Sequence, residues 1–284
     1  MERIKVGIIG LGQMGASLGF ALKSKSAGNK YYIIGVSRKR ETLKTALKTG
    51  AADKVSLSLQ DVKGCGIVVI CTPVDTIVPI YKQLSEIVDK STIITDTGSV
   101  KHSIECRIEE LRVKSENTKS VNSALSFVGS HPMAGNEKKG IFSADAQMFK
   151  GANVIITGKF TQKEKIIAKM WKDAGANIIN MSAKKHDELA ALTSHLTHCI
   201  AFSFNKVYKD AKRKDPEIDK ITAGSFKSMV RVASSNADMW APIFAANGEN
   251  IIKRLDAFIK ELNAFKKVLK NKAKVKKEIL RTQL

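Results

Sequence analysis

The sequence has little of what secreted, membrane-spanning or metal-binding proteins need. It contains only four cysteines, with no CxxC pair and no metal-ligand spacing, so we expect reduced thiols, a cytoplasmic location and no bound metal. No run of about 18 apolar residues occurs, so we expect no transmembrane helix. The short apolar run near the N-terminus is followed by glycines, which is not a signal-peptide pattern. With 43% hydrophobic residues and five prolines, the composition is typical of a globular protein.

Acidic residues are also scarce. The 284 residues include 27 Asp and Glu against 48 Lys and Arg, giving a net charge of +21. Nucleic-acid binding is one interpretation, but no basic motif with interleaved aromatic residues accompanies the charge. A lysine-rich, solvated surface that attracts anionic ligands is the simpler interpretation. We therefore expect a small-molecule substrate and neither a nucleic-acid nor a membrane partner.

The most informative stretch begins five residues from the N-terminus. An apolar run over residues 4–9 predicts a buried strand, and it is followed by Gly10-x-Gly12-x-x-Gly15 and a helical pattern. In such a loop the first glycine allows a tight turn, the second lets the backbone approach a pyrophosphate, and the third brings helix and strand together. The helix start then offers free N–H groups to the phosphates. This placement predicts dinucleotide binding.

The next strand predicts which dinucleotide is preferred. The strand over residues 31–36 ends at Ser37, where such folds usually carry an acidic residue for the ribose hydroxyls. Basic residues follow from Arg38 to Arg40, and guanidinium groups suit a 2′-phosphate. We therefore expect NADP to be favoured over NAD, although these charges could also belong to an ordinary helix start. The expected cofactor-binding residues are Gly10, Gly12, Gln13, Met14, Gly15, Ser37, Arg38, Thr72 and Pro73.

Strands and helices alternate as far as residue 182, which predicts an α/β fold with a Rossmann-like, doubly wound parallel sheet. The polar stretch 112–126 is expected to be a long connection. Residues 183–284 show only helical periodicity, with a polar turn over 209–216 and a frayed basic tail after residue 270. An apolar stripe over residues 251–265 is more than one small helical domain could bury. We therefore expect an all-helical domain that forms a homodimer.

Several motifs together resemble the prephenate/arogenate dehydrogenase family of tyrosine biosynthesis. They are the glycine loop and the segments Asp96-Thr97-Gly98-Ser99-Val100-Lys101, Gly129-Ser130-His131-Pro132-Met133-Ala134-Gly135-x-Glu137, Ser194-His195-Leu196-x-His198 and Arg231-x-Ala233-x-Ser235-x-x-x-Met239-Trp240. Three departures are Thr197, where the family often has proline, Ser37 in place of the usual acidic residue, and a long connection between Ser99 and His131.

The resemblance implies an NAD(P)-dependent dehydrogenase that oxidatively decarboxylates prephenate or arogenate to 4-hydroxyphenylpyruvate or tyrosine. It implies His131 and Ser99 as catalytic residues, and it implies substrate-binding roles for Arg231, Glu137, His198 and Ser194. Structural roles remain open for some of them: Ser99 could cap a helix, His198 could be a core histidine, and Arg231 could form a surface ion pair.

Two other functions compete with this interpretation. A β-hydroxyacid dehydrogenase would share the cofactor domain and helical second domain, but it would need a helical lysine facing the nicotinamide, and no candidate stands out. A non-catalytic NADP-binding sensor is the second alternative, and the presence of His131 and Arg231 argues against it.

Overall fold

The computed structural model describes residues 3–24, 27–118, 125–136 and 138–283, and it divides into two compact units. The first comprises Met1–Asp187 and Ser234–Ala246, and the second comprises Glu188–Ala233 and Asn247–Leu284. The domain boundary expected at residues 182 and 183 stays a prediction. Each unit is described by itself.

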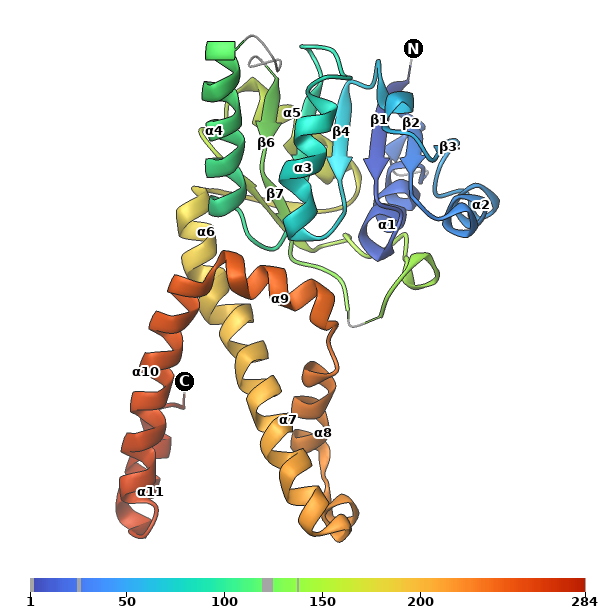
Figure 1. Cartoon of the computed structure of the whole chain (residues 1–284). Coiled ribbons are helices and arrows are strands. Elements are labelled where there is room, and N and C mark those ends of the chain that lie inside the picture. The colour runs from blue at the N-terminus through green and yellow to red at the C-terminus, as the bar shows by residue number, and fades with distance from the viewer. Residues whose placement is uncertain (1–2, 25–26, 119–124, 137, 284) are drawn as a thin grey trace. The chain divides into compact units, whose positions relative to one another are not determined.

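A six-stranded parallel sheet forms the centre of the first unit, with strand order β3-β2-β1-β4-β5-β6 (Figure 1). This order confirms the predicted Rossmann-like sheet, since strands are added toward one edge from β1 to β3 and toward the other edge from β4 onward. The strands are β1 (Ile4–Ile9), β2 (Tyr31–Val36), β3 (Lys54–Ser56), β4 (Ile67–Ile70), β5 (Ile93–Asp96) and β6 (Ser126–Val128). In β1, Ile9 lies opposite both Val36 and Ile70, so three carboxyl ends meet at one edge.

Helices connect these strands. They are α1 (Gln13–Leu22), α2 (Arg40–Thr49), the short η2 (Leu59–Val62), α3 (Val74–Leu84), α4 (His102–Thr118) and α5 (Gln162–Asp173). The 3-10 turn η3 (Ile141–Ser143) and α9 (Ala237–Ala246) complete the helices of this unit.

The last three strands form a separate sheet, and this corrects the expectation of one continuous parallel sheet. They are β7 (Ser130–Pro132), β8 (Asn153–Thr157) and β9 (Asn177–Met181); β7 and β8 are antiparallel, whereas β8 and β9 are parallel. Only Gly129 separates β6 from β7, and a parallel neighbour needs a crossover of about a dozen residues or more. For this reason β7 leaves the first sheet and pairs with β8.

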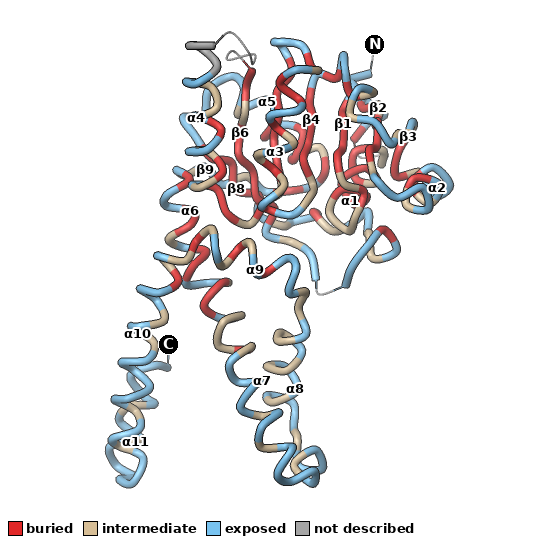
Figure 2. Tube along the Cα trace, in the orientation of Figure 1, coloured by how far each residue is buried: buried red, intermediate tan, exposed pale blue. Residues whose placement is uncertain are grey.

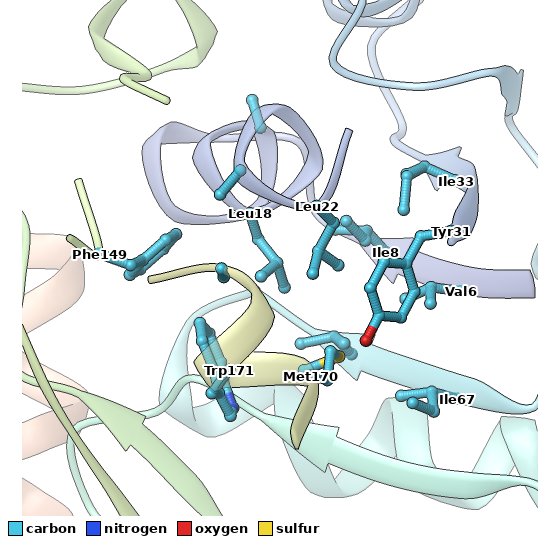
Figure 3. Close-up of a cluster of buried hydrophobic side chains, with 14 of the residues drawn as sticks. Val6, Ile8, Leu18, Leu22, Tyr31, Ile33, Ile67, Phe149, Met170 and Trp171 are labelled. Atoms are coloured by element: carbon cyan, nitrogen blue, oxygen red, sulfur yellow. The ribbon is translucent and has the colours of Figure 1, made fainter. Parts of the chain in front are cut away.

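The core of the first unit lies between its sheets and helices, where the buried residues concentrate (Figure 2). Leu18 and Leu22 of α1 point toward Ile8 of β1, and Phe149 packs edge-to-face on Trp171 of α5 with ring centroids 5.2 Å apart (Figure 3). All five side chains are fully buried. Burying side chains of this size contributes about 1.5–3 kcal/mol each, so the core fixes α1 and α5 relative to the strands.

The second unit contains only helices, as predicted. The continuous run that begins with α6 (Ala183–Ala190) enters this unit and continues through the π-helical turn η4 (Ala191–His195) into α7 (Leu196–Lys214). Then come η5 (Pro216–Ile221), α8 (Gly224–Ala233), α10 (Gly248–Val268) and α11 (Lys272–Leu280). Phe226 of α8 packs against Phe204 and Tyr208 of α7. Among the described residues, no helix is long and apolar enough to cross a membrane.

Three expected irregular segments are at least partly helical, which corrects the predictions. Residues 112–118 extend α4, residues 209–214 extend α7, and the tail after residue 270 forms α11; residues 119–124 lie outside the described residues. These segments are rich in lysine, arginine and glutamate, which are good helix formers even without an apolar stripe. The α7 helix ends just before Pro216, and Asn271 caps α11 by accepting from the N–H of Lys274.

A buried ion pair joins the end of β5 to the start of α4. The Lys101 ammonium donates to Oδ2 of Asp96, and both side chains are inaccessible to solvent. Lys101 Nζ also donates to the carbonyl oxygen of Ser130 at 2.9 Å, while Oδ1 of Asp96 accepts from the N–H of Ser130 at 3.1 Å. The pair therefore fixes β7 against the carboxyl end of β5.

Replacing Lys101 with methionine keeps most of the side-chain volume but leaves the Asp96 carboxylate buried without its cation. We expect Lys101→Met to lower the free energy of unfolding by about 3–5 kcal/mol, measured by urea denaturation. Lys54→Ala breaks an exposed ion pair with Asp61 and is the control, for which we expect little change. Unfolding of Lys101→Met at the wild-type urea concentration would contradict this account of the pair.

Candidate active site

The glycine loop lies at the carboxyl edge of the parallel sheet, between β1 and α1. The N–H of Gly10 donates to the carbonyl of Val36 at 2.8 Å, which holds the loop beside the end of β2. A Cβ atom on Gly15 would lie 2.1 Å from the carbonyl oxygen of Gly10, so only glycine allows α1 to begin this close to the strand.

Gly12 stands at the N-cap of α1 and differs from Gly15 in what surrounds it. Apart from its chain neighbours, a Cβ atom on Gly12 would meet none of the described residues within 4 Å, and the first turn of α1 carries no acidic residue. The requirement for glycine there is therefore not set by the protein's own packing. An open approach to a helix N-terminus fits a pyrophosphate, so the glycine loop has the space and the free N–H groups that a dinucleotide needs.

The other expected cofactor residues lie along the same edge. Ser37 and Arg38 directly follow β2, with Ser37 half-buried and Arg38 exposed. Thr72 follows β4, and its Cγ2 lies 2.8 Å from where a Cβ on Gly10 would stand, while Pro73 is the N-cap of α3. The structure thus brings Thr72 against the glycine loop.

Gln13 joins this loop to the segment that follows β7. Its Nε2 donates to Oδ1 of Asn136 at 2.7 Å, and its Oε1 accepts from the N–H of Asn136 at 3.2 Å. Met14 lies at the same place, since its sulfur is 3.5 Å from a Cβ built on Gly135. The side chain of Gln13 therefore hydrogen-bonds to the residue that directly follows the His-Pro-Met-Ala-Gly segment, and this ties that segment to the start of α1.

His131 lies in the middle of β7 and is only 9% exposed. The preceding residue holds it in place, because Ser130 Oγ donates to the carbonyl of Asp96 at 2.5 Å and accepts from Nε1 of Trp171 at 3.1 Å. Together with the Lys101 contact, these bonds fix the backbone beside His131. A buried histidine on a rigid strand at the carboxyl edge is well placed to act on a bound ligand.

Two residues that the sequence reasoning missed contact His131 or continue its hydrogen bonding. Nε2 of His186 lies 2.8 Å from Nδ1 of His131, and Nδ1 of His186 lies 2.7 Å from Oδ1 of Asp187. The two imidazole rings meet edge-to-face, with centroids 5.0 Å apart. Adjacent His and Asp residues near the start of a helix were the available signal, but their burial was not visible from the pattern.

The remaining expected residues of the first unit are less constrained. Ser99 is half-buried in the turn between β5 and α4, and Nδ1 of His131 shares a hydrogen bond with Nε2 of His186. Glu137 lies outside the described residues. The catalytic role of Ser99 and the binding role of Glu137 stay predictions.

In the second unit, the structure brings Ser194 and His198 together. Nδ1 of His198 donates to the carbonyl of Ser194 at 3.0 Å, one helical turn away. Burial lowers the pKa of His198 despite this hydrogen bond, which favours neutral imidazole. Ser194 belongs to the π-helical turn η4, a feature that often occurs at functional sites and that the sequence pattern did not predict. Arg231 is exposed in the last turn of α8.

Comparisons with known proteins agree with these features. Residues 20–180 match the nucleotide-binding domain of prephenate dehydrogenase, and residues 182–282 match its dimerization domain. The chain is 30% identical to prephenate dehydrogenase of Bacillus subtilis over 261 residues, covering 90% of this chain and 67% of that protein. It is 33% identical to cyclohexadienyl dehydrogenase of Zymomonas mobilis over 262 residues, covering 90% of this chain and 85% of that protein.

The similarity extends to a solved structure. A crystal structure of prephenate dehydrogenase from Aquifex aeolicus, in complex with hydroxyphenyl propionate and NAD+, has a TM-score of 0.85 at 30% identity. The match covers 99% of this chain and 96% of that one. With both domains matched and the cofactor loop and buried histidine in place, this chain belongs to the prephenate dehydrogenase family.

Proposed function

We propose that His131 acts as the general base of the dehydrogenase reaction that this family implies for the chain. The reaction is the oxidative decarboxylation of prephenate or arogenate with hydride transfer to NAD(P), and it yields 4-hydroxyphenylpyruvate or tyrosine. The observation that carries the proposal is the buried imidazole of His131 on β7, in a segment whose later residue Asn136 hydrogen-bonds to Gln13 directly after the glycine loop.

The chemistry needs a base at one substrate atom. Both substrates are cyclohexadienes that carry a ring carboxylate and, para to it, a carbinol. The bound nicotinamide supplies the hydride acceptor. His131 draws the hydroxyl proton as carbonyl character develops, the carboxylate leaves as carbon dioxide, and its bonding electrons enter the ring. His131 then returns the proton to the phenol oxygen, so aromatisation occurs without net proton release.

Arg231 is proposed to bind a substrate carboxylate. A guanidinium group pairs with a carboxylate in a planar fork, and this interaction exists before and during the reaction. His198, Ser194 and Glu137 are proposed to line the same pocket. In support, neutral His198 donates through Nδ1 and leaves Nε2 as the accepting nitrogen of its ring.

NADP is the proposed preferred cofactor. Ser37 stands directly after β2, where an acidic side chain would repel a 2′-phosphate, and Arg38 to Arg40 are exposed beside it. A carboxylate at that position usually selects NAD through the ribose hydroxyls. The absence of that carboxylate and the local positive charge both favour the phosphorylated form.

The assembly is proposed to be a homodimer formed by the helical unit. Ile252, Ile259 and Leu262 of α10 are 59%, 45% and 53% exposed within one chain, so part of the predicted apolar stripe is uncovered there. A second copy covering this stripe fits the match to a dimerization domain. The cytoplasmic location stays a prediction.

Substitutions at the two proposed reactive positions should separate chemistry from binding. His131→Asn removes a base that acts mainly in the transition state, so kcat should fall by about 10²–10⁴-fold with little change in KM. Arg231→Gln should chiefly raise KM, because a lost charge-assisted hydrogen bond costs about 1.5–3 kcal/mol in both states. Steady-state kinetics with prephenate and arogenate measure both effects.

Arg213→Gln is the control for the arginine substitution, since it removes an exposed arginine of α7 that pairs with Asp210. We expect wild-type kinetics from it. The roles assigned here would be overturned if His131→Asn changed only KM and Arg231→Gln changed only kcat. Wild-type rates in both variants would show that neither His131 nor Arg231 takes part in the reaction.

The cofactor preference can be tested by restoring the acidic residue. Ser37→Asp should lower kcat/KM for NADP relative to NAD by tenfold or more, a difference of about 1.4 kcal/mol, because the carboxylate repels the 2′-phosphate. Ser91→Asp is the control, as it adds the same charge two residues before β5, at the opposite edge of the sheet. If the wild-type enzyme already uses NAD at least as efficiently as NADP, the preference is wrong.

A further inference from the structure

The proposed reaction leaves a buried histidine and a buried aspartate without a role. His186 and Asp187 are 3% and 2% exposed and lie in the middle of α6. Residues of these types are rarely buried unless they are paired. Here they form a line of hydrogen bonds that ends on His131, which lies 55 residues earlier in the chain.

Asp187 is the fixed end of this line. Its Oδ1 accepts from the N–H of Lys101 and its Oδ2 from the N–H of His102, each at 2.9 Å. Both N–H groups stand at the start of α4, where the helix dipole favours a negative charge. Of the other charged groups at this place, Lys101 and Asp96 pair with each other and Glu105 accepts a hydrogen bond from Thr157, so Asp187 is the anion that hydrogen-bonds to this pair of histidines.

The hydrogen bonds determine which nitrogen atoms carry protons. An ionised carboxylate only accepts, so Nδ1 of His186 must be the donor to Oδ1. In a neutral imidazole the second nitrogen is then unprotonated. Nε2 of His186 must therefore accept from Nδ1–H of His131. By the same rule, Nε2 of His131 is the unprotonated nitrogen. That is the protonation state a general base requires.

We propose that His186 and Asp187 are positioning residues that fix the tautomer of His131 and stabilise the proton it takes up. The inference rests on the proposed role of His131 and deepens it. When the substrate O–H bond breaks and the proton binds Nε2 of His131, the Nδ1 proton of that ring can shift to Nε2 of His186. The positive charge then lies next to the Asp187 carboxylate. The same shifts reverse when the phenol oxygen takes its proton back, so no further acid or base is consumed.

The test reads the tautomers directly. The chain has five histidines, so ¹⁵N-histidine labelling gives few imidazole signals, and single substitutions assign them. In wild-type protein we expect the proton on Nδ1 in both His131 and His186. In Asp187→Asn, the amide can keep an oxygen toward a backbone N–H and present its NH2 to Nδ1 of His186. Both rings should then move their proton to Nε2, and kcat should fall by about 10²–10⁴-fold with little change in KM.

A second pair of variants keeps the inference testable should Asp187→Asn fail to fold. The oxygen of His186→Gln can accept from Nδ1–H of His131, whereas His186→Leu offers no acceptor. The glutamine variant should keep the His131 proton on Nδ1 and retain more kcat than the leucine variant. Tyr31→Phe is the control for the loss of a partly buried hydrogen bond in the same unit, since Tyr31 donates to Asp173 at 2.8 Å. We expect wild-type tautomers and rates from it.

Three results would overturn the inference. They are a wild-type proton on Nε2 of His131, an unchanged His131 tautomer and kcat in Asp187→Asn, or the same tautomer and kcat in His186→Gln and His186→Leu. If the wild-type protein oxidised neither prephenate nor arogenate, the proposed function would fail. The tautomers would still show whether His186 and Asp187 hold the proton of His131 on Nδ1. The two failures are therefore distinguishable.

Discussion

The buried ion pair between Lys101 and Asp96 is the interaction on which the rest of the site depends. The Lys101 side chain neutralises Asp96 at the end of β5 and binds the Ser130 carbonyl, and Asp96 holds the Ser130 N–H. The backbone N–H of the same lysine binds Asp187. One residue therefore determines where β7 leaves the sheet and where the carboxylate behind His186 lies.

A second constraint acts through the glycine loop. Close packing of Gly15 on the Gly10 carbonyl sets the start of α1, and Gln13 in the first turn pairs with Asn136 beyond β7. The segment that carries His131 is thus tied at both ends, to the ion pair before it and to the cofactor loop after it. A base held in this way can meet the substrate hydroxyl without a large rearrangement, which is how orientation contributes to rate.

Local patterns were sufficient to predict the parallel strands and the glycine loop between β1 and α1, whereas the role of His131 stays a prediction. They predicted less well where charged residues form helices, as in residues 112–118, because apolar periodicity is weak there. The His131–His186 contact was not predictable from spacing, since it depends on β7 pairing antiparallel with β8 and on burial of α6. Long-range pairing of polar groups leaves no periodic trace in a sequence.

The central claim is that a dinucleotide and a cyclohexadiene substrate meet at the carboxyl edge of this sheet, with His131 as the base. It is tested most directly by a matrix of kcat/KM values for prephenate, arogenate and a β-hydroxyacid, each with NAD and NADP. The account predicts oxidation of prephenate or arogenate, no oxidation of the β-hydroxyacid, and a larger kcat/KM with NADP. Oxidation of the β-hydroxyacid alone, or cofactor binding without oxidation of either cyclohexadiene, would contradict it.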